Sequence, residues 1–161
     1  MTAKTSSTIP FVIHGEGSGV AQRIVASGSA GHTFAADAFP AFGGKDQSPS
    51  PLFYVLGSLS SCNQVTASLV AKDLGVRLGA WKFEVQGDLD PSVLATGAEG
   101  NANFVRVVVQ ASVETDASEE QFARLVSETE RRCPVTQLFK RSGLQFDNRW
   151  QRTALALAQA S

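Results

Sequence analysis

Two cysteines are the residues of this chain with the clearest chemical potential. Cys62 and Cys133 are the only cysteines, and they lie far apart in the sequence. Cysteine can serve as a nucleophile, a redox thiol or a metal ligand. This spacing fits neither a disulfide scaffold nor a CxxC redox turn. Two lone cysteines in a reducing compartment are most often inert core residues, so that interpretation stays open beside the chemical ones.

The histidines do not extend the cysteines into a metal site. His14 and His32 are the only histidines, and no CxxC or HxxxH spacing is present to hold a tetrahedral zinc ion. We therefore expect no metal and no cofactor. His32 is expected to be a strand residue whose ring is satisfied, and a proton shuttle near the cysteines is the alternative.

Composition limits the class of protein. With 161 residues, 43% hydrophobic and 18% charged, residues 1–161 match a single domain, with a core at about 11–150 and tails at 1–8 and 151–161. A net charge of −1 leaves no positive excess for nucleic acid or an anionic membrane. No apolar stretch approaches the roughly 20 residues that span a bilayer, and no secretory signal is recognisable. We expect a soluble, cytoplasmic protein without nucleic-acid or membrane partners.

Hydrophobic spacing predicts that Cys62 lies in the middle of a long helix over residues 51–74. Ser50 is a good N-cap, Pro51 suits the first helical position, and Gly75 can end the helix in the left-handed conformation. Small and apolar residues recur at three- and four-residue steps, which predicts one buried stripe. The stripe consists of Leu52, Val55, Leu56, Leu59, Cys62, Thr66 and Leu69.

Cys133 is predicted to lie at the end of a second helix. Ser118 and Gln121 have the spacing of a capping box, so the helix begins there. It must end close to Cys133, because Pro134 disfavours the helical conformation for the residue before it. A short helix over residues 134–141 follows. The cations around Cys133 are expected to form a solvated helix end; they are Arg131, Arg132, Lys140 and Arg141.

The remaining elements are predicted strands and connections. Three short strands form a meander at the start of the chain, with the Gly15–Gly19 run as the first turn. Alternating residues predict further strands later in the chain. The predicted strands cover residues 11–14, 20–26, 32–37, 81–86, 105–113 and 144–150. Residues 38–49 are expected to be a loop, 87–103 a polar connection, and 151–161 a frayed or weakly helical tail.

Several segments together resemble the OsmC/Ohr family, which is named after osmotically inducible protein C and organic hydroperoxide resistance protein. They are Gly43-Gly44-Lys45-Asp46, Ser48-Pro49-Ser50-Pro51-Leu52, Leu59-Ser60-Ser61-Cys62 and Cys133-Pro134-Val135-Thr136-Gln137. The resemblance runs from about residue 11 to 150. It implies an α+β fold, with antiparallel sheets around a long central cysteine-bearing helix and with two chains intertwined as a homodimer.

The resemblance also implies a function for the two cysteines. In Ohr-type members the first cysteine is oxidised by an organic hydroperoxide, and the second condenses with the resulting sulfenic acid to form a disulfide. By position, Cys62 is then the peroxidatic cysteine and Cys133 the resolving one. The implied partners are a small apolar hydroperoxide and a thiol reductant.

The chain departs from the family pattern at two positions that affect the expected rate. Leu52 stands where efficient peroxidases of the family carry a glutamate, and Phe42 stands where OsmC-type members carry an arginine. Ohr-type members place that arginine on an earlier strand, where Arg23 is the candidate. Cys62 lies too deep in its helix for the helix dipole to act on it, and apolar burial raises a thiol pKa. We therefore expect Cys62 to react slowly at neutral pH.

These departures leave two alternatives to a peroxidase, so whether the protein is an enzyme stays undecided. The first is a non-catalytic dimer of the same fold that binds an apolar ligand, or senses oxidants, through the groove beside Cys62. In the second, both thiols are inert. Phe39 and Phe42 either line an acyl pocket or cover the dimer seam. The long helix is apolar or small around most of its circumference, so we expect a second chain to cover it.

Overall fold

The computed structural model describes residues 8–156 except Ser29, and it confirms an α+β fold. The chain divides into two compact units, one up to Tyr54 and one from Val55 onward, and each is considered by itself. The predicted single domain over residues 1–161 stays a prediction.

The first unit is built on a three-stranded antiparallel meander, as predicted. Strands β1 (Val12–Ser18), β2 (Ala21–Ser27) and β3 (Thr33–Ala36) are ordered β1-β2-β3, and η1 (Pro40–Phe42) follows. The predicted turn over residues 15–19 is wrong in its extent, because Gly15 and Gly17 belong to β1. A Cβ on Gly17 would lie 2.2 Å from the Ala21 carbonyl oxygen, so glycine permits a close approach of the two strands.

A buried carboxylate organises the loop after β3. Asp37 is 4% exposed. Its side chain accepts backbone hydrogen bonds from Ala38 at 2.8 Å and from Lys45 and Gln47, both at 3.1 Å. These bonds, with that from Gln47 the strongest, hold the pKa of Asp37 below its ordinary value. The predicted loop therefore has a defined conformation fixed by one side chain.

Helix α1 (Pro51–Leu74) has the predicted bounds, and Gly75 follows it with φ of 67°. The predicted buried stripe is only partly right. Leu59 and Thr66 are buried, but Leu52, Val55 and Leu69 are 37%, 42% and 54% exposed. The residues that are buried are Leu59, Asn63, Thr66, Ala67, Val70 and Ala71. Thus, one face of α1 packs within the chain and a second apolar face does not.

The second unit contains a mixed sheet of strands β4 (Leu78–Leu89), β5 (Phe104–Thr115) and β6 (Gln145–Ala154), ordered β4-β5-β6. β4 and β5 are antiparallel, whereas β5 and β6 are parallel. The sheet is therefore not wholly antiparallel, because the chain crosses over through two helices before β6. Residues 151–154, predicted to be part of a frayed tail, extend β6 by pairing with residues 112–115. Residues 157–161 of that tail lie outside the described residues.

The connections of this unit are helical. Helix α2 (Ser92–Thr96) interrupts the predicted polar connection between β4 and β5. Helices α3 (Glu119–Arg132) and α4 (Pro134–Arg141) form the crossover between β5 and β6. The predicted capping box is confirmed, because the Ser118 hydroxyl accepts from the Gln121 backbone N–H and the Gln121 side chain accepts from the Ser118 N–H.

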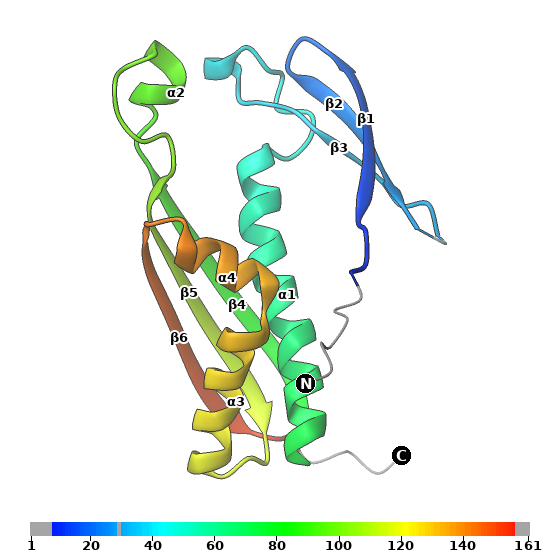
Figure 1. The fold of residues 1–161 in the computed structure, drawn as a ribbon, viewed down its shortest axis with the longest axis vertical. Coiled ribbons are helices and arrows are strands. Elements are labelled where there is room, and N and C mark those ends of the chain that lie inside the picture. Colours follow the sequence, from blue (N-terminus) through cyan, green and yellow to red (C-terminus); the bar gives the residue numbers. More distant parts are fainter. Residues whose placement is uncertain (1–7, 29, 157–161) are drawn as a thin grey trace, which may run out of the picture. The chain divides into compact units, whose positions relative to one another are not determined.

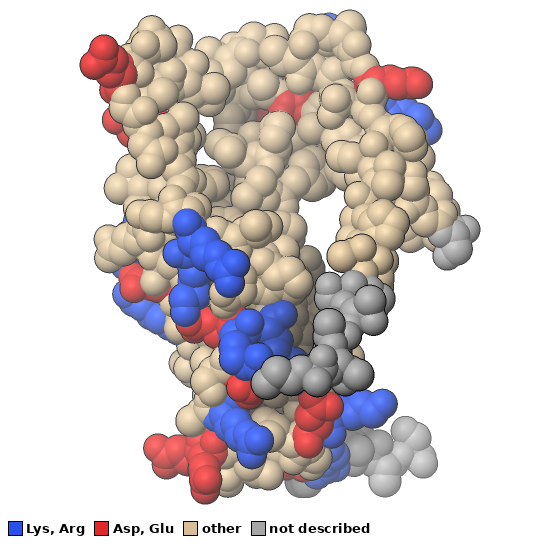
Figure 2. Space-filling model, viewed as in Figure 1, with Lys and Arg blue, Asp and Glu red and all other residues tan. Residues whose placement is uncertain are grey.

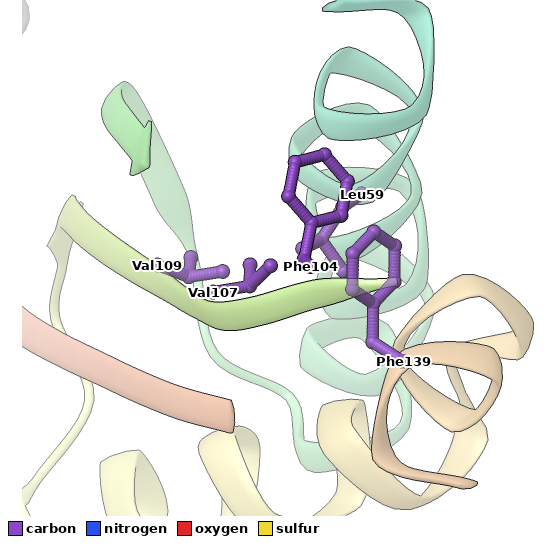
Figure 3. Close-up of a cluster of buried hydrophobic side chains, with 5 residues drawn as sticks. All are labelled: Leu59, Phe104, Val107, Val109 and Phe139. Atoms are coloured by element: carbon purple, nitrogen blue, oxygen red, sulfur yellow. The ribbon is translucent and has the colours of Figure 1, made fainter. Parts of the chain in front are cut away.

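Helices α1, α3 and α4 pack on one face of this sheet (Figure 1). Two buried clusters hold them there. The first combines Leu59 of α1, Phe139 of α4 and three residues of β5, as Figure 3 shows. The second joins α1 to α3 through Leu125 and consists of Ala67, Val70, Ala71 and Leu125. Because α1 and α4 share a cluster over β5, the cysteines on these two elements have fixed relative positions.

Candidate functional site

The two cysteines meet in the second unit. Cys62 lies in the middle of α1 and is partly exposed, whereas Cys133 lies between α3 and α4 and is fully buried. Both are free thiols, and they lie close enough for each to shift the pKa of the other. The structure thus brings together the two cysteines that the sequence singled out, one of them partly exposed and the other enclosed.

Cys133 occupies the junction of two helices. Its backbone N–H donates to the Thr129 carbonyl at 2.9 Å, which closes α3. Its sulfur accepts from the Thr136 backbone N–H at 3.4 Å, which caps the start of α4. Pro134 at the first helical position has no N–H to satisfy. The Cys133 sulfur therefore lies at the positive end of the α4 dipole.

Buried polar side chains surround the thiols. Asn63 and Thr136 are fully buried, and Thr66 is 6% exposed. The Asn63 Nδ2 donates to the Leu59 carbonyl at 2.8 Å and to the Thr136 Oγ1 at 3.2 Å. The Thr66 hydroxyl lowers the pKa of both thiols. Buried polar groups carry a desolvation cost unless they are paired, so this network is specific to the site.

The sequence analysis did not identify Asn63 or Thr136 as functional residues. One signal was available for each. Asn63 is an amide beside a cysteine, within the small and apolar face of a helix where amides are uncommon. Thr136 is the third residue of a helix that begins at Pro134. At this position the backbone N–H faces the side chain of the N-cap residue, Cys133. Neither signal predicts that the two side chains meet, because they come from different helices.

The two thiols differ in the direction of their pKa shifts. Burial raises the pKa of Cys62, and the Cys133 sulfur beside it adds to this, against the Val135 N–H and the Thr66 hydroxyl. Burial also opposes ionisation of Cys133, but hydrogen bonds from the Thr136 hydroxyl and the Thr136 N–H, together with Cys62, outweigh it and lower the pKa. Hydrogen bonding at the start of α4 therefore favours the thiolate form of Cys133, whereas burial disfavours that of Cys62. The expected raised pKa of Cys62 agrees with this structure.

Three of the four cations that flank Cys133 in the sequence form ion pairs with carboxylates. Arg131 pairs with Glu128 at 2.7 Å, and Arg132 pairs with Asp73 of α1 at 2.6 Å. Lys140 forms a salt bridge with Glu130. Figure 2 shows Lys and Arg side chains interspersed with Asp and Glu over the face formed by α3 and α4. These groups form the expected solvated helix end.

The candidate arginine Arg23, the alternative proton shuttle His32 and the two departures from the family pattern, Phe42 and Leu52, all lie in the first unit. Arg23 is exposed, and its Nη2 donates to the Thr33 hydroxyl at 3.4 Å. His32 is exposed and precedes β3 rather than lying in it, which corrects its predicted place in a strand. Phe42 and Leu52 are 38% and 37% exposed. Any role of these residues at the thiols stays a prediction.

Within residues 8–156 apart from Ser29, three or more His, Cys, Asp or Glu side chains nowhere gather as they would around a metal ion. In the same part of the chain, no helix combines the length and apolar character needed to cross a membrane. The thiol pair thus remains the candidate site.

Solved structures share this fold at low sequence identity. An OsmC-like protein from Mycoplasma pneumoniae superimposes with a TM-score of 0.69 at 17% identity, covering 93% of this chain and 100% of that one. An organic hydroperoxide resistance protein from Elizabethkingia anophelis gives 0.70 at 14% identity, covering 92% and 100%. That of Bacillus subtilis gives 0.58 at 19% identity, covering 89% and 98%. No match to this sequence was found among curated proteins.

A match to a family model assigns the chain to a family, which similarity of fold alone does not do. The model described as OsmC-like protein matches residues 44–147. This range is more than half of the chain and includes both cysteines and the helices that carry them. The protein therefore belongs to the OsmC-like protein family.

Proposed function

We propose that the protein is a thiol-dependent organic hydroperoxide reductase that uses Cys62 and Cys133. One observation carries the proposal: two free cysteines from distant parts of the sequence lie close enough to shift each other's pKa, one partly exposed and the other buried. An attacking thiol must meet its substrate, whereas a resolving thiol must meet only the attacking sulfur. Solved relatives named organic hydroperoxide resistance proteins support this proposal.

The proposed reaction consumes one hydroperoxide and oxidises two thiols. The Cys62 thiolate attacks the terminal oxygen of ROOH; the S–O bond forms, the O–O bond breaks, and RO⁻ leaves and is protonated to ROH. The Cys133 thiolate then attacks the sulfenic sulfur, the S–S bond forms, and hydroxide leaves and becomes water with one proton. An external dithiol, supplied by a reducing cytoplasm, returns both cysteines to thiols.

An exposed apolar stripe on α1 favours an organic substrate over hydrogen peroxide. Val55 and Leu69 lie seven residues before and after Cys62, so all three share one side of the helix. Val55 and Leu69 are 42% and 54% exposed, and Val65, one turn beyond Cys62, is 62% exposed. Apolar surface of this kind gains free energy when it contacts an alkyl or aryl group. A bulky R group is therefore the expected substrate feature.

The same stripe supports the homodimer that the family resemblance implies. Monomeric proteins seldom leave a contiguous apolar helix face uncovered. We propose that a second copy of this chain covers part of it and leaves the part beside Cys62 open to the R group of the substrate. The thermal midpoint should then rise with protein concentration. Light scattering that gives a monomeric mass at micromolar concentration contradicts this part of the proposal.

Treatment with stoichiometric cumene hydroperoxide tests the reaction. Both free thiols should disappear, and mass spectrometry should find one intramolecular disulfide between Cys62 and Cys133. In Cys133→Ser, a sulfenic acid on Cys62 should be trapped by dimedone. Cys62→Ser is the matched control and should leave the Cys133 thiol unmodified. Two unchanged thiols in the wild-type protein contradict the proposal.

A non-catalytic role is the second candidate, and the raised pKa of Cys62 favours it. A protonated thiol reacts slowly. Such low reactivity is sufficient for a ligand carrier or for a slow oxidant sensor. The two candidates differ in turnover. With excess dithiothreitol and excess cumene hydroperoxide, a reductase consumes many equivalents of peroxide, whereas a carrier or sensor consumes at most one.

A further inference from the structure

A side-chain contact between Asn63 and Thr136 joins the two segments that carry the cysteines. Asn63 directly follows Cys62 in α1, and its Nδ2 donates to the Thr136 Oγ1 at 3.2 Å. The Thr136 hydroxyl also lies within donating distance of the Asn63 Oδ1, at 3.4 Å. The Thr136 backbone N–H donates to the Cys133 sulfur at 3.4 Å. Thr136 is therefore bonded both to the residue beside Cys62 and to Cys133 itself.

Both side chains of this contact are fully buried. The Asn63 Nδ2 donates a second hydrogen bond, to the Leu59 carbonyl at 2.8 Å. Taking an amide and a hydroxyl out of water costs free energy that their mutual hydrogen bonds largely offset, and two apolar side chains of the same shape would avoid that cost. Stability alone therefore does not explain why a polar pair lies here.

What the polar pair adds is direction. Leu59 and Phe139 also join α1 to α4, but through apolar contact, which is non-directional. A hydrogen bond, in contrast, restricts both distance and angle. A disulfide is equally restrictive, because its Cβ atoms must lie about 3.5–4.5 Å apart with a dihedral angle near ±90°. A directional contact next to Cys62 is thus well placed to control whether the two sulfurs can bond.

We propose that Asn63 and Thr136 are positioning residues, which hold the Cys133 sulfur where it can form a disulfide with Cys62. The use of this arrangement in catalysis rests on the proposed reductase function. Once Cys62 is a sulfenic acid, two reactions compete. Attack by Cys133 forms the S–S bond and releases water, whereas a second ROOH converts the sulfenic acid to a sulfinic acid and leaves as ROH. A positioned Cys133 favours the first reaction, because intramolecular attack needs no further encounter.

A second polar contact ties α1 to the segment before Cys133, but it lies at the surface. Arg132 pairs with Asp73, near the end of α1, at 2.6 Å, and the Asp73 side chain is 61% exposed. Exposed ion pairs are screened by solvent and restrict their partners weakly. We therefore assign the positioning to the buried Asn63–Thr136 contact, and the ion pair serves as a control.

Thiol–disulfide exchange with glutathione tests the inference without any peroxide. Glutathione disulfide oxidises the two cysteines to one disulfide and leaves as two glutathione thiols, so the equilibrium constant measures how readily the protein sulfurs bond. Thr136→Val keeps the shape of the side chain but removes its hydroxyl, and it should lower this constant by about 3–10-fold, the effect of one hydrogen bond. Asn63→Leu should lower it as well. Thr136→Ser, which restores a hydroxyl, should retain the wild-type constant.

Two matched controls separate positioning from general loss of structure. Thr129→Val makes the same chemical change at another fully buried threonine, one turn before Cys133, whose hydroxyl finds no hydrogen-bond partner among the residues that the structure describes. Asp73→Asn weakens the exposed ion pair. Neither variant should change the exchange constant. A constant in Thr136→Val and Asn63→Leu that is unchanged or higher overturns the inference, as does a loss in Thr129→Val equal to that in Thr136→Val.

A second readout follows the competition at Cys62. With excess cumene hydroperoxide and dithiothreitol, Thr136→Val should accumulate more sulfinic acid on Cys62 than the wild-type protein and Thr129→Val, as measured by mass spectrometry. The glutathione constant keeps this inference distinct from the proposed function. If the wild-type protein consumes no peroxide but the exchange constants differ as expected, the reductase proposal fails and the positioning role stands. If peroxide is consumed but the constants do not differ, the positioning role fails alone.

Discussion

The middle of α1 and the start of α4 each present one thiol, and the two thiols have opposite tendencies to ionise. Both sulfurs experience burial, which disfavours a thiolate. Only Cys133 lies at a helix start, where the Thr136 N–H points at the sulfur. The comparison teaches that the position of a cysteine along the backbone, more than the residues next to it in sequence, decides which thiol is acidic.

Asp37 in the first unit follows the same principle with a different acid. Its carboxylate is buried, yet three backbone N–H groups keep its pKa low. Burial and ionisation are therefore compatible wherever unused N–H groups converge. The interior of α1 offers no such groups to Cys62, and the Val135 N–H at the start of α4 lowers its pKa by less than burial raises it.

The largest expected effect separates the tasks of the two sulfurs. Cys62→Ser should abolish reduction of cumene hydroperoxide, a loss of at least about 10³-fold, because a hydroxyl is no substitute for the attacking sulfur. Cys133→Ser should lose multiple turnover but still consume up to one equivalent of peroxide. Coupled peroxide assays with a dithiol reductant measure both. If Cys133→Ser loses peroxide consumption equally in single-turnover and multiple-turnover assays, then Cys133 is needed for more than resolving the sulfenic acid.

The next effect concerns the packing that holds α1 against α4. Leu59 is fully buried and packs in the cluster that includes Phe139 (Figure 3). Leu59→Ala should lower the free energy of unfolding by about 2–5 kcal/mol, since it leaves a cavity between the two thiol-bearing elements. Urea unfolding measures this loss. Val65→Ala, on the exposed stripe of α1, should change the stability of the isolated chain by no more than about 0.5 kcal/mol.

Local patterns predicted the elements of this fold well, because their signals lie within a few residues. Ser50, Pro51 and Gly75 mark the bounds of α1, and the Ser118–Gln121 capping box marks the start of α3. The buried face of α1 was harder to predict. Apolar residues occur around most of that helix, and periodicity alone does not show which of its faces the sheet covers.

The site was predictable in its residues and not in its electrostatics. The spacing of Cys62 and of Cys133 before Pro134 identified the pair through a family resemblance. The contact between Asn63 and Thr136 depends on how α1 packs against α4, and no spacing within either helix encodes it. The lowered pKa of Cys133 has the same origin, because it needs the neighbouring Cys62 as well as the helix start.

A smaller effect is the dependence of reaction rate on pH. The raised pKa of Cys62 moves its own ionisation to higher pH, so more attacking thiolate forms as pH rises. The second-order rate of peroxide consumption should increase from about pH 7 to 9 and go on rising above the ordinary thiol pKa of about 8.5. Stopped-flow measurement of thiol loss tests this. A fast rate that does not change over this range would show that a cation, with Arg23 as the candidate, already holds Cys62 as a thiolate.

The smallest effect lies at the far end of α3, the helix that delivers Cys133. Ser118→Ala removes the hydroxyl that accepts from the Gln121 N–H, which is one half of the capping box. Loss of such a cap costs about 1 kcal/mol, so the thermal midpoint should fall by a few degrees. The dependence of Cys62 alkylation by iodoacetamide on pH should not change, because the Cys133 N–H still donates to the Thr129 carbonyl in the last turn of α3. Ser127→Ala is the matched control, since that exposed hydroxyl bonds only to the Arg124 carbonyl of the same helix. If Ser118→Ala shifts the pH dependence of Cys62 alkylation, then α3 as a whole affects the acidity of the thiol pair. The difference between a helix interior and a helix start would then not be enough to explain the opposite pKa shifts of the two thiols.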